Sequence, residues 1–166
     1  MNAALYATIW LALALFVAGA AAEHGSARTE TWGRRAWALG APLCVLHMLV
    51  ALGTRHGWSQ AHAAAEIARR SAEVYGWRWS GAIWVNYSFA TLWSAEAAWR
   101  GLRPAAYARR PRALAWTLRG FYLVVVVNAA IVFASPAGRV VGVPLVAWLV
   151  WSWRPARRAR VALDEA

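Results

Sequence analysis

Five stretches of the chain contain no charged residue, and short polar segments rich in arginine separate them. A helix that crosses a bilayer needs about 20 apolar residues, with about 17 as the lower limit. The first four stretches reach this length with their flanking residues, whereas the fifth is short and contains Pro144. The pattern predicts transmembrane helices at about 3–23, 35–53, 79–99, 115–135 and 138–153.

A shorter helix is expected in the polar segment between the second and third stretches. Ser59 is a residue type that caps a helix start, and Gly76 is one that ends a helix. Between them, residues 59–75 carry alanines on one face and charged side chains on the other. The charged face has i,i+4 pairs of opposite sign, such as Glu66 and Arg70. We expect this amphipathic helix to lie on the outer surface of the membrane.

The expected fold class is therefore an all-α membrane protein, a bundle of about five transmembrane helices with one amphipathic outer-surface helix. The chain is 61% hydrophobic and 15% charged. An ordinary soluble domain is about 45–50% apolar and about 25% charged. Because the apolar excess is gathered in five stretches, residues 1–166 are expected to form a single integral membrane domain.

Arginine supplies the basic charge and is spread unevenly over the two sides of this bundle. The formal net charge is +11. Twelve arginines would lie on one side and five on the other, with the tail on the arginine-rich side. The positive-inside rule makes that side cytoplasmic. We therefore expect a protein of the inner (cytoplasmic) membrane, with the N-terminus outside and the C-terminus in the cytoplasm. The twelve are Arg28, Arg34, Arg35, Arg100, Arg103, Arg109, Arg110, Arg112, Arg154, Arg157, Arg158 and Arg160.

The basic charge by itself could indicate nucleic-acid binding. Arginines in the loops of a membrane protein have a simpler explanation, so nucleic acid is not an expected partner. The expected partners are the lipid bilayer and other membrane subunits.

The first apolar stretch resembles a signal peptide, but no basic residue precedes it, so we expect it to remain as a helix. Cys44 is the only cysteine and indicates neither an intrachain disulfide nor a metal cluster.

Three polar side chains interrupt separate apolar stretches at one predicted depth. His47, Asn86 and Asn128 each lie six or seven residues from the outer end of their helix. At 1.5 Å per residue this is roughly 9–10 Å below the outer surface. A polar group facing lipid is costly, so all three are expected to face the bundle interior near one another. They could join helices by hydrogen bonds or form a cofactor site; the cofactor is unknown, and the chain need not carry one of its own.

A second candidate site lies in the outer segment above His47. His56, His62 and Glu66 supply two imidazoles and a carboxylate, which can bind zinc or another metal. Their spacing matches no established metal motif. The sequence has no P-loop, nucleophile elbow or HExxH motif, and no catalytic residue is assigned.

Glu96 lies near the inner end of the third predicted helix. It can pair with Arg100 at i,i+4 or with Arg119 near the start of the next helix. We expect a structural ion pair among these residues. The alternative is a carboxylate that accepts protons.

The stretch W-x-N-Y-x-F-x-x-x-W-x-x-E-x-x-W at residues 84–99, with HGWSQAHA upstream, resembles small multi-pass bacterial membrane proteins. The resemblance covers about half of the chain, Arg55–Arg100 and the surroundings of Asn128. It implies a membrane location and carries no activity.

These features favour a structural or accessory subunit of a larger membrane complex, of the respiratory or photosynthetic type. Thirteen tryptophans and small residues spaced by four, such as Ala18 and Ala22, suit close packing between helices. The alternative is a redox or metal-binding membrane protein. It would use His47, Asn86 and Asn128 together with His56 and His62.

Overall fold

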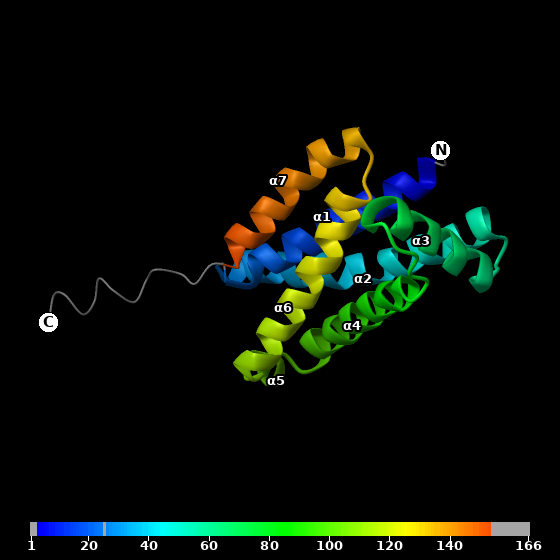
Figure 1. Cartoon of the computed structure of the whole chain (residues 1–166). Coiled ribbons are helices and arrows are strands. Elements are labelled where there is room, and N and C mark those ends of the chain that lie inside the picture. The colour runs from blue at the N-terminus through cyan, green and yellow to red at the C-terminus, as the bar shows by residue number, and fades with distance from the viewer. Residues whose placement is uncertain (1–2, 25, 154–166) are drawn as a thin grey trace, which may run out of the picture.

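A computed structural model describes residues 3–24 and 26–153 of the chain (Figure 1). All regular elements in these ranges are helical. Three helices are long and apolar enough to cross a membrane, and a fourth apolar helix, Pro136–Ser152, is shorter. The all-helical class is thus confirmed, and the three apolar helices of spanning length agree with a membrane protein, whereas the count of five spanning helices is not confirmed. The three are Ala3–Ala21, Arg28–His56 and Arg112–Val132.

Each predicted apolar stretch corresponds to a helix, and most helix ends differ by a few residues from the predicted ends. A 3₁₀ turn at Ala22–His24 follows the first helix, and a π-helical turn at Asn128–Val132 continues the sixth. The α-helices are α1 (Ala3–Ala21), α2 (Ala27–His56), α3 (Gln60–Tyr75), α4 (Ala82–Leu102), α5 (Pro104–Ala108), α6 (Arg112–Val127) and α7 (Pro136–Ser152).

The boundaries of α2 and α4 differ from the predicted ones. α2 begins at Ala27 rather than near 35, because the Ser26 hydroxyl caps it by accepting a hydrogen bond from the backbone N–H of Thr29 at 3.3 Å. α4 runs from Ala82 to Leu102 rather than over 79–99. As a result, Glu96 is well inside α4 instead of about one turn from its end.

α3 matches the predicted amphipathic helix. The Ser59 hydroxyl accepts a hydrogen bond from the backbone N–H of His62 at 3.2 Å, and Gly76 ends the helix in the left-handed conformation, with φ of 77°. Ala63, Ala68 and Ser71 are buried, so this face of the helix packs on protein.

Helices α1 and α2 form the most extensive contact between elements. A Cβ atom at Gly33 would lie 2.3 Å from the Cβ of Ala22, and one at Gly19 would lie 2.9 Å from the Trp37 ring. The two backbones therefore approach closely at these glycines. In lipid, this kind of close packing is the main source of helix association.

An aromatic core joins α1, α2, α4 and α6. Phe16 lies at its centre, with ring centroids 4.7 Å from Trp37, 5.0 Å from Trp93 and 5.4 Å from Tyr122. Phe89 packs edge-on against Tyr122 at 5.6 Å. Such tilted and edge-to-face contacts are the favoured geometry for aromatic rings. The core holds these four helices together and fixes the position of Tyr122.

Helices α3 and α5 lie at opposite ends of the bundle (Figure 1). α5 connects α4 and α6 at one end, and α3 lies near the other ends of these helices. The Tyr87 hydroxyl of α4 donates to Gln60 of α3, and the Tyr75 hydroxyl of α3 donates to Asn128 after α6. α3 is therefore tied to both helices, once at each of its ends.

Candidate functional site

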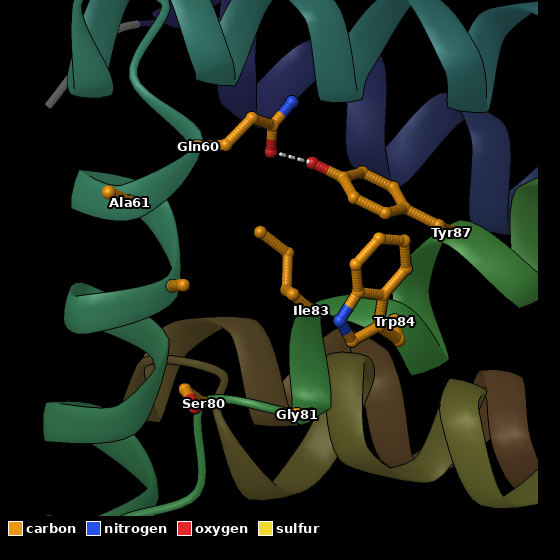
Figure 2. Close-up of a pocket in the computed structure, with 8 residues that line it drawn as sticks. Gln60, Ala61, Ser80, Gly81, Ile83, Trp84 and Tyr87 are labelled. Carbon is orange, nitrogen blue, oxygen red and sulfur yellow. Dashed lines mark hydrogen bonds between the residues drawn. The ribbon is translucent and has the colours of Figure 1, made fainter.

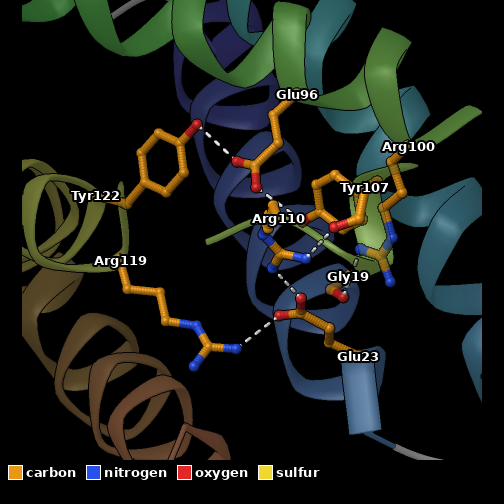
Figure 3. A network of polar contacts seen from close by, with 8 residues as sticks. All are labelled: Gly19, Glu23, Glu96, Arg100, Tyr107, Arg110, Arg119 and Tyr122. Atoms are coloured by element: carbon orange, nitrogen blue, oxygen red, sulfur yellow. Dashed lines mark hydrogen bonds and ion pairs between the residues drawn. The ribbon is translucent and has the colours of Figure 1, made fainter. Parts of the chain in front are cut away.

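Glu96 is the centre of a polar network at the α5 end of the bundle (Figure 3). Its side chain is buried, with a relative exposure of 7%. Oε1 accepts a hydrogen bond from the Tyr107 hydroxyl at 2.7 Å, and Oε2 accepts one from the Tyr122 hydroxyl at 2.8 Å. Within the described ranges, no ion pair joins Glu96 to Arg100 or Arg119, so the structure does not form the ion pair expected from the sequence. The fold brings two tyrosines to the carboxylate instead.

Arg100 is buried as well, and it reaches α1 rather than Glu96. Its Nη1 donates a long hydrogen bond, 3.5 Å, to the carbonyl oxygen of Gly19. That carbonyl belongs to the last turn of α1, where a helix carries partial negative charge. Arg100 therefore stabilises the end of α1 and fastens it to α4.

Glu23, just after α1, binds Arg119, one of the two arginines predicted to pair with Glu96, together with Arg110. It accepts a hydrogen bond from Nη2 of Arg110 and one from Nη2 of Arg119 at 2.9 Å (Figure 3). Burial by itself would raise the pKa of Glu23, but the hydrogen bonds and charges of the two arginines outweigh burial, so its pKa lies below the ordinary value. The pairs join the end of α1 to α6 and to the connector before it.

Tyr107 of α5 links the two acidic residues. Its hydroxyl donates to Glu96, and the Arg110 guanidinium lies over its ring, 3.8 Å from the centroid. Burial, together with the nearby charges of Glu96 and Glu23, raises the pKa of Tyr107, so its hydroxyl stays protonated as a donor. We call the seven side chains the Glu96 network: Glu23, Glu96, Arg100, Tyr107, Arg110, Arg119 and Tyr122.

Four members of the Glu96 network were not predicted from the sequence: Glu23, Tyr107, Arg110 and Tyr122. Tyr107, Arg110 and Tyr122 lie 11 or more residues from the acid that each contacts, and Arg110 is 87 residues from Glu23. One signal was available in the sequence: acidic residues are few in a chain with net charge +11, so each is expected to attract a donor. The identity of that donor depends on tertiary contacts.

The polar side chains expected at one depth do not form a cluster. His47 shares a hydrogen bond of 3.0 Å with Thr8 of α1, through its Nδ1. Asn128 accepts from Tyr75 and donates to the Val124 carbonyl at 2.7 Å. In the part of the chain that the structure describes, no hydrogen bond joins any two of His47, Asn86 and Asn128. The expected shared site is therefore not formed by direct contacts, because α1 and α3 supply the partners.

Asn86 is exposed, although it lies on the bundle side of α4. Ala90 and Trp93, four and seven residues further along, share this face and are buried. This face of α4 is thus buried by neighbouring helices at Ala90 and Trp93, but it is exposed at Asn86, one turn nearer the start of the helix. An amide at this position is accessible from outside the chain.

The predicted metal site is not assembled. The rings of His56 and His62 do meet, with centroids 5.4 Å apart. Glu66, however, is engaged by Arg69 at 2.6 Å and by Arg70 at 3.2 Å, and the hydrogen bond from Arg69 is the largest cause that lowers its pKa to about 2. Among the described residues, no group of three or more His, Cys, Asp or Glu side chains is placed to hold a metal. His56, His62 and Glu66 are therefore not arranged as three metal ligands in the described structure, because the helical neighbours Arg69 and Arg70 bind the carboxylate.

Two cavities lie along one stripe of α4. The first, of about 460 Å³, lies between α3 and the start of α4 (Figure 2) and is lined by Gln60, Ala61, Ala64, Ser80, Gly81, Ile83, Trp84 and Tyr87. The second, of about 480 Å³, lies between α2 and α4 and is lined by Ala38, Ala41, Pro42, Val45, Ser94, Ala97 and Ala98. We call the second cavity the α2–α4 groove. Tyr87, Ser94 and Ala98 follow helical spacing, so the cavities share one face of α4.

Comparison with known proteins gives no relative from which a function could be taken. No protein-family model matches the chain, no curated protein matches it, and no solved structure matches it. The function therefore has to be inferred from the geometry of the described residues.

Proposed function

We propose that the protein is a structural or accessory subunit of a larger membrane complex, and that it binds a partner helix in the α2–α4 groove. The groove supports this proposal most directly. Its lining is made almost entirely of small side chains, and Ala38 and Ala98 are exposed on its two walls. Small residues let a second helix approach closely, and such packing drives association where lipid already solvates apolar surface.

Exposed tryptophans beside the bundle helices add to this support. Trp84, with a relative exposure of 68%, lines the first cavity and lies on the same stripe of α4 as the groove. Trp148 on α7 is also exposed. Rigid aromatic side chains give large contact areas at interfaces. A partner on the α4 side would cover Trp84 together with the groove.

The Glu96 network favours a structural role over a chemical one. The acids at the α5 end are already engaged within the chain, Glu96 by two tyrosines and Glu23 by two arginines. A buried polar network whose acids are hydrogen-bonded stabilises one arrangement of its helices. Each of the four carboxylate oxygens already accepts a hydrogen bond from a side chain of the protein.

We further propose that the α5 end faces the cytoplasm and that the membrane is the inner one. The support is the bias of twelve arginines to five, which follows the positive-inside rule. Eight of the twelve are described, whereas Arg154, Arg157, Arg158 and Arg160 lie outside the described residues. Labelling of single cysteines placed at Arg109 and Arg55 in intact cells tests the orientation. Reaction at 109 from outside would contradict it.

Co-purification in mild detergent tests the proposed function. Ala38→Leu and Ala98→Leu would fill the groove from either wall, and we expect each to release the partner that the unchanged protein retains. Ala14→Leu and Ala147→Leu make the same change at exposed positions of α1 and α7 and serve as matched controls. Near-ultraviolet circular dichroism checks that the variants keep their aromatic packing. A complex that survives both groove variants would overturn the proposal.

A further inference from the structure

We propose that the α5 end binds the headgroups of anionic phospholipids through Arg103, Arg109 and Arg112. These arginines flank the two ends of α5 (Pro104–Ala108). The inference does not depend on a partner subunit in the α2–α4 groove. It assigns a ligand class to a part of the surface that the proposed function leaves unexplained.

The arginines around α5 are of two kinds. Arg110 turns inward, where Nη2 pairs with Glu23 and Nη1 donates to the Tyr107 carbonyl at 3.0 Å. Arg103, Arg109 and Arg112 are exposed. Over the described ranges, no hydrogen bond or ion pair engages the side chains of these three. They present three positive charges outward from one short connector.

Among the described residues, no acid pairs with these three arginines. No acidic residue lies between Glu96 and Asp164 in the sequence. Glu96 and Glu23, which lie at the α5 end, are engaged in the Glu96 network, and Glu30 in the first turn of α2 pairs with Arg34 at 3.6 Å. A counterion for the three exposed arginines must therefore come from outside the described chain.

The position of α5 favours lipid as the source of that anion. The last residue of α4 is Leu102, with a relative exposure of 82%, and Arg112 opens a helix long and apolar enough to cross a membrane. Leu114, two residues into that helix, is exposed as well. Positive charge next to exposed leucine matches the boundary between phosphate headgroups and acyl chains. Guanidinium groups also bind phosphate through two parallel hydrogen bonds.

The connector holds the three arginines in place. The Tyr107 hydroxyl bonds to Glu96, and the Arg110 guanidinium stacks on the Tyr107 ring while it pairs with Glu23. These contacts anchor α5 to α4 and to the end of α1. The charges are thus presented from a fixed support, which lowers the entropy lost when a headgroup binds.

Native mass spectrometry of the full chain tests the proposal. The purified protein is exchanged into mixed micelles with equal phosphatidylglycerol and phosphatidylcholine, and bound lipids are counted. We expect a preference for phosphatidylglycerol that Arg109→Gln with Arg112→Gln lowers by on the order of 10- to 30-fold, because one basic residue near an anionic surface changes affinity about fivefold. Arg109→Lys with Arg112→Lys should retain most of the preference and shows that the fold survives changes there.

Arg55→Gln with Arg78→Gln is the matched control. It removes the same charge from two exposed arginines toward the α3 end, and we expect the preference to remain. Equal losses in the test and control pairs would overturn the proposal, as would a preference that the α5 pair leaves unchanged. Inorganic phosphate that protects the protein against heat as well as phosphatidylglycerol does would also overturn it, because the source of the anion would then not be lipid.

Discussion

Tyr122 of α6 donates its hydroxyl hydrogen to Oε2 of Glu96 in α4 at 2.8 Å, while its ring packs in the aromatic core against Phe16 and Phe89. One side chain thus belongs to both the apolar core and the polar network. The ring fixes the direction of the hydroxyl, and the hydroxyl gives the buried acid a donor. This relationship explains how α4 accepts a glutamate deep among helices.

Replacement of Glu96 should separate the loss of charge from the loss of hydrogen bonds. Glu96→Gln keeps an oxygen acceptor for one tyrosine, so we expect a modest loss of thermal stability and an intact assembly. Glu96→Leu leaves the Tyr107 and Tyr122 hydroxyls buried without an acceptor, at a cost of about 1–3 kcal/mol for each. Thermal unfolding in detergent measures the difference. Loss of function in Glu96→Gln with an unchanged assembly would instead mark Glu96 as a functional carboxylate.

The two tyrosines should be coupled through the acid they share. Tyr107→Phe and Tyr122→Phe each remove one donor while keeping the ring, and each should lower the free energy of unfolding by about 1–2 kcal/mol. Because both donors bind Glu96, the double variant should differ from the sum by about 0.5 kcal/mol or more. Unfolding of the four proteins gives this coupling. Strict additivity would argue against a shared acceptor.

Acid should weaken the α5 end through Glu23. Its pKa in the folded protein lies below the ordinary carboxyl value of 4.5, so its pairs with Arg110 and Arg119 contribute stability above that pH. This contribution is lost as the pH falls through the folded pKa. Melting temperature measured from pH 7 to pH 3 should drop more in the unchanged protein than in Glu23→Gln. Parallel curves for the two proteins would contradict the assignment, since Glu66 titrates in both.

Two glycines in helices should respond in opposite ways to alanine. A Cβ at Gly142 of α7 would lie 2.0 Å from the carbonyl oxygen of Ala130, which is backbone and cannot rotate away, so Gly142→Ala should cost about 1–3 kcal/mol. At Gly120 of α6 a Cβ meets nothing within 4 Å. Gly120→Ala should therefore be neutral or stabilise the helix by up to about 1 kcal/mol. Thermal unfolding checks both, and equal shifts would contradict the close approach of α7 to the π-helical turn.

Local features of the chain were predictable from sequence because their causes are local. Uncharged stretches set the positions of α1, α2, α4, α6 and α7, since apolar length is a property of consecutive residues. α3 was predictable with its ends, because Ser59 and Gly76 act on the backbone next to them. The i,i+4 pair of Glu66 and Arg70 followed from helix geometry and is present. The boundary of α2 was missed, because the cap at Ser26 precedes the apolar stretch.

The partners of the buried polar groups were decided by the tertiary structure. Glu96 has Arg100 at helical spacing, yet it binds Tyr107 and Tyr122, which lie 11 and 26 residues away. Glu23 finds Arg110 across 87 residues. Several donors in the sequence could satisfy each acid, and only the packing of α4, α5 and α6 selects among them.

The same packing separates arginines that look alike in the sequence. Arg109 and Arg110 are neighbours, but one is exposed and the other is held against Glu23 and the ring of Tyr107. Composition determined that this chain is basic and apolar, and the pattern of uncharged stretches determined that it is helical. Which charges are used inside the protein and which are left for its surroundings depends on distances between residues far apart in sequence, and those distances exist only once the helices have packed.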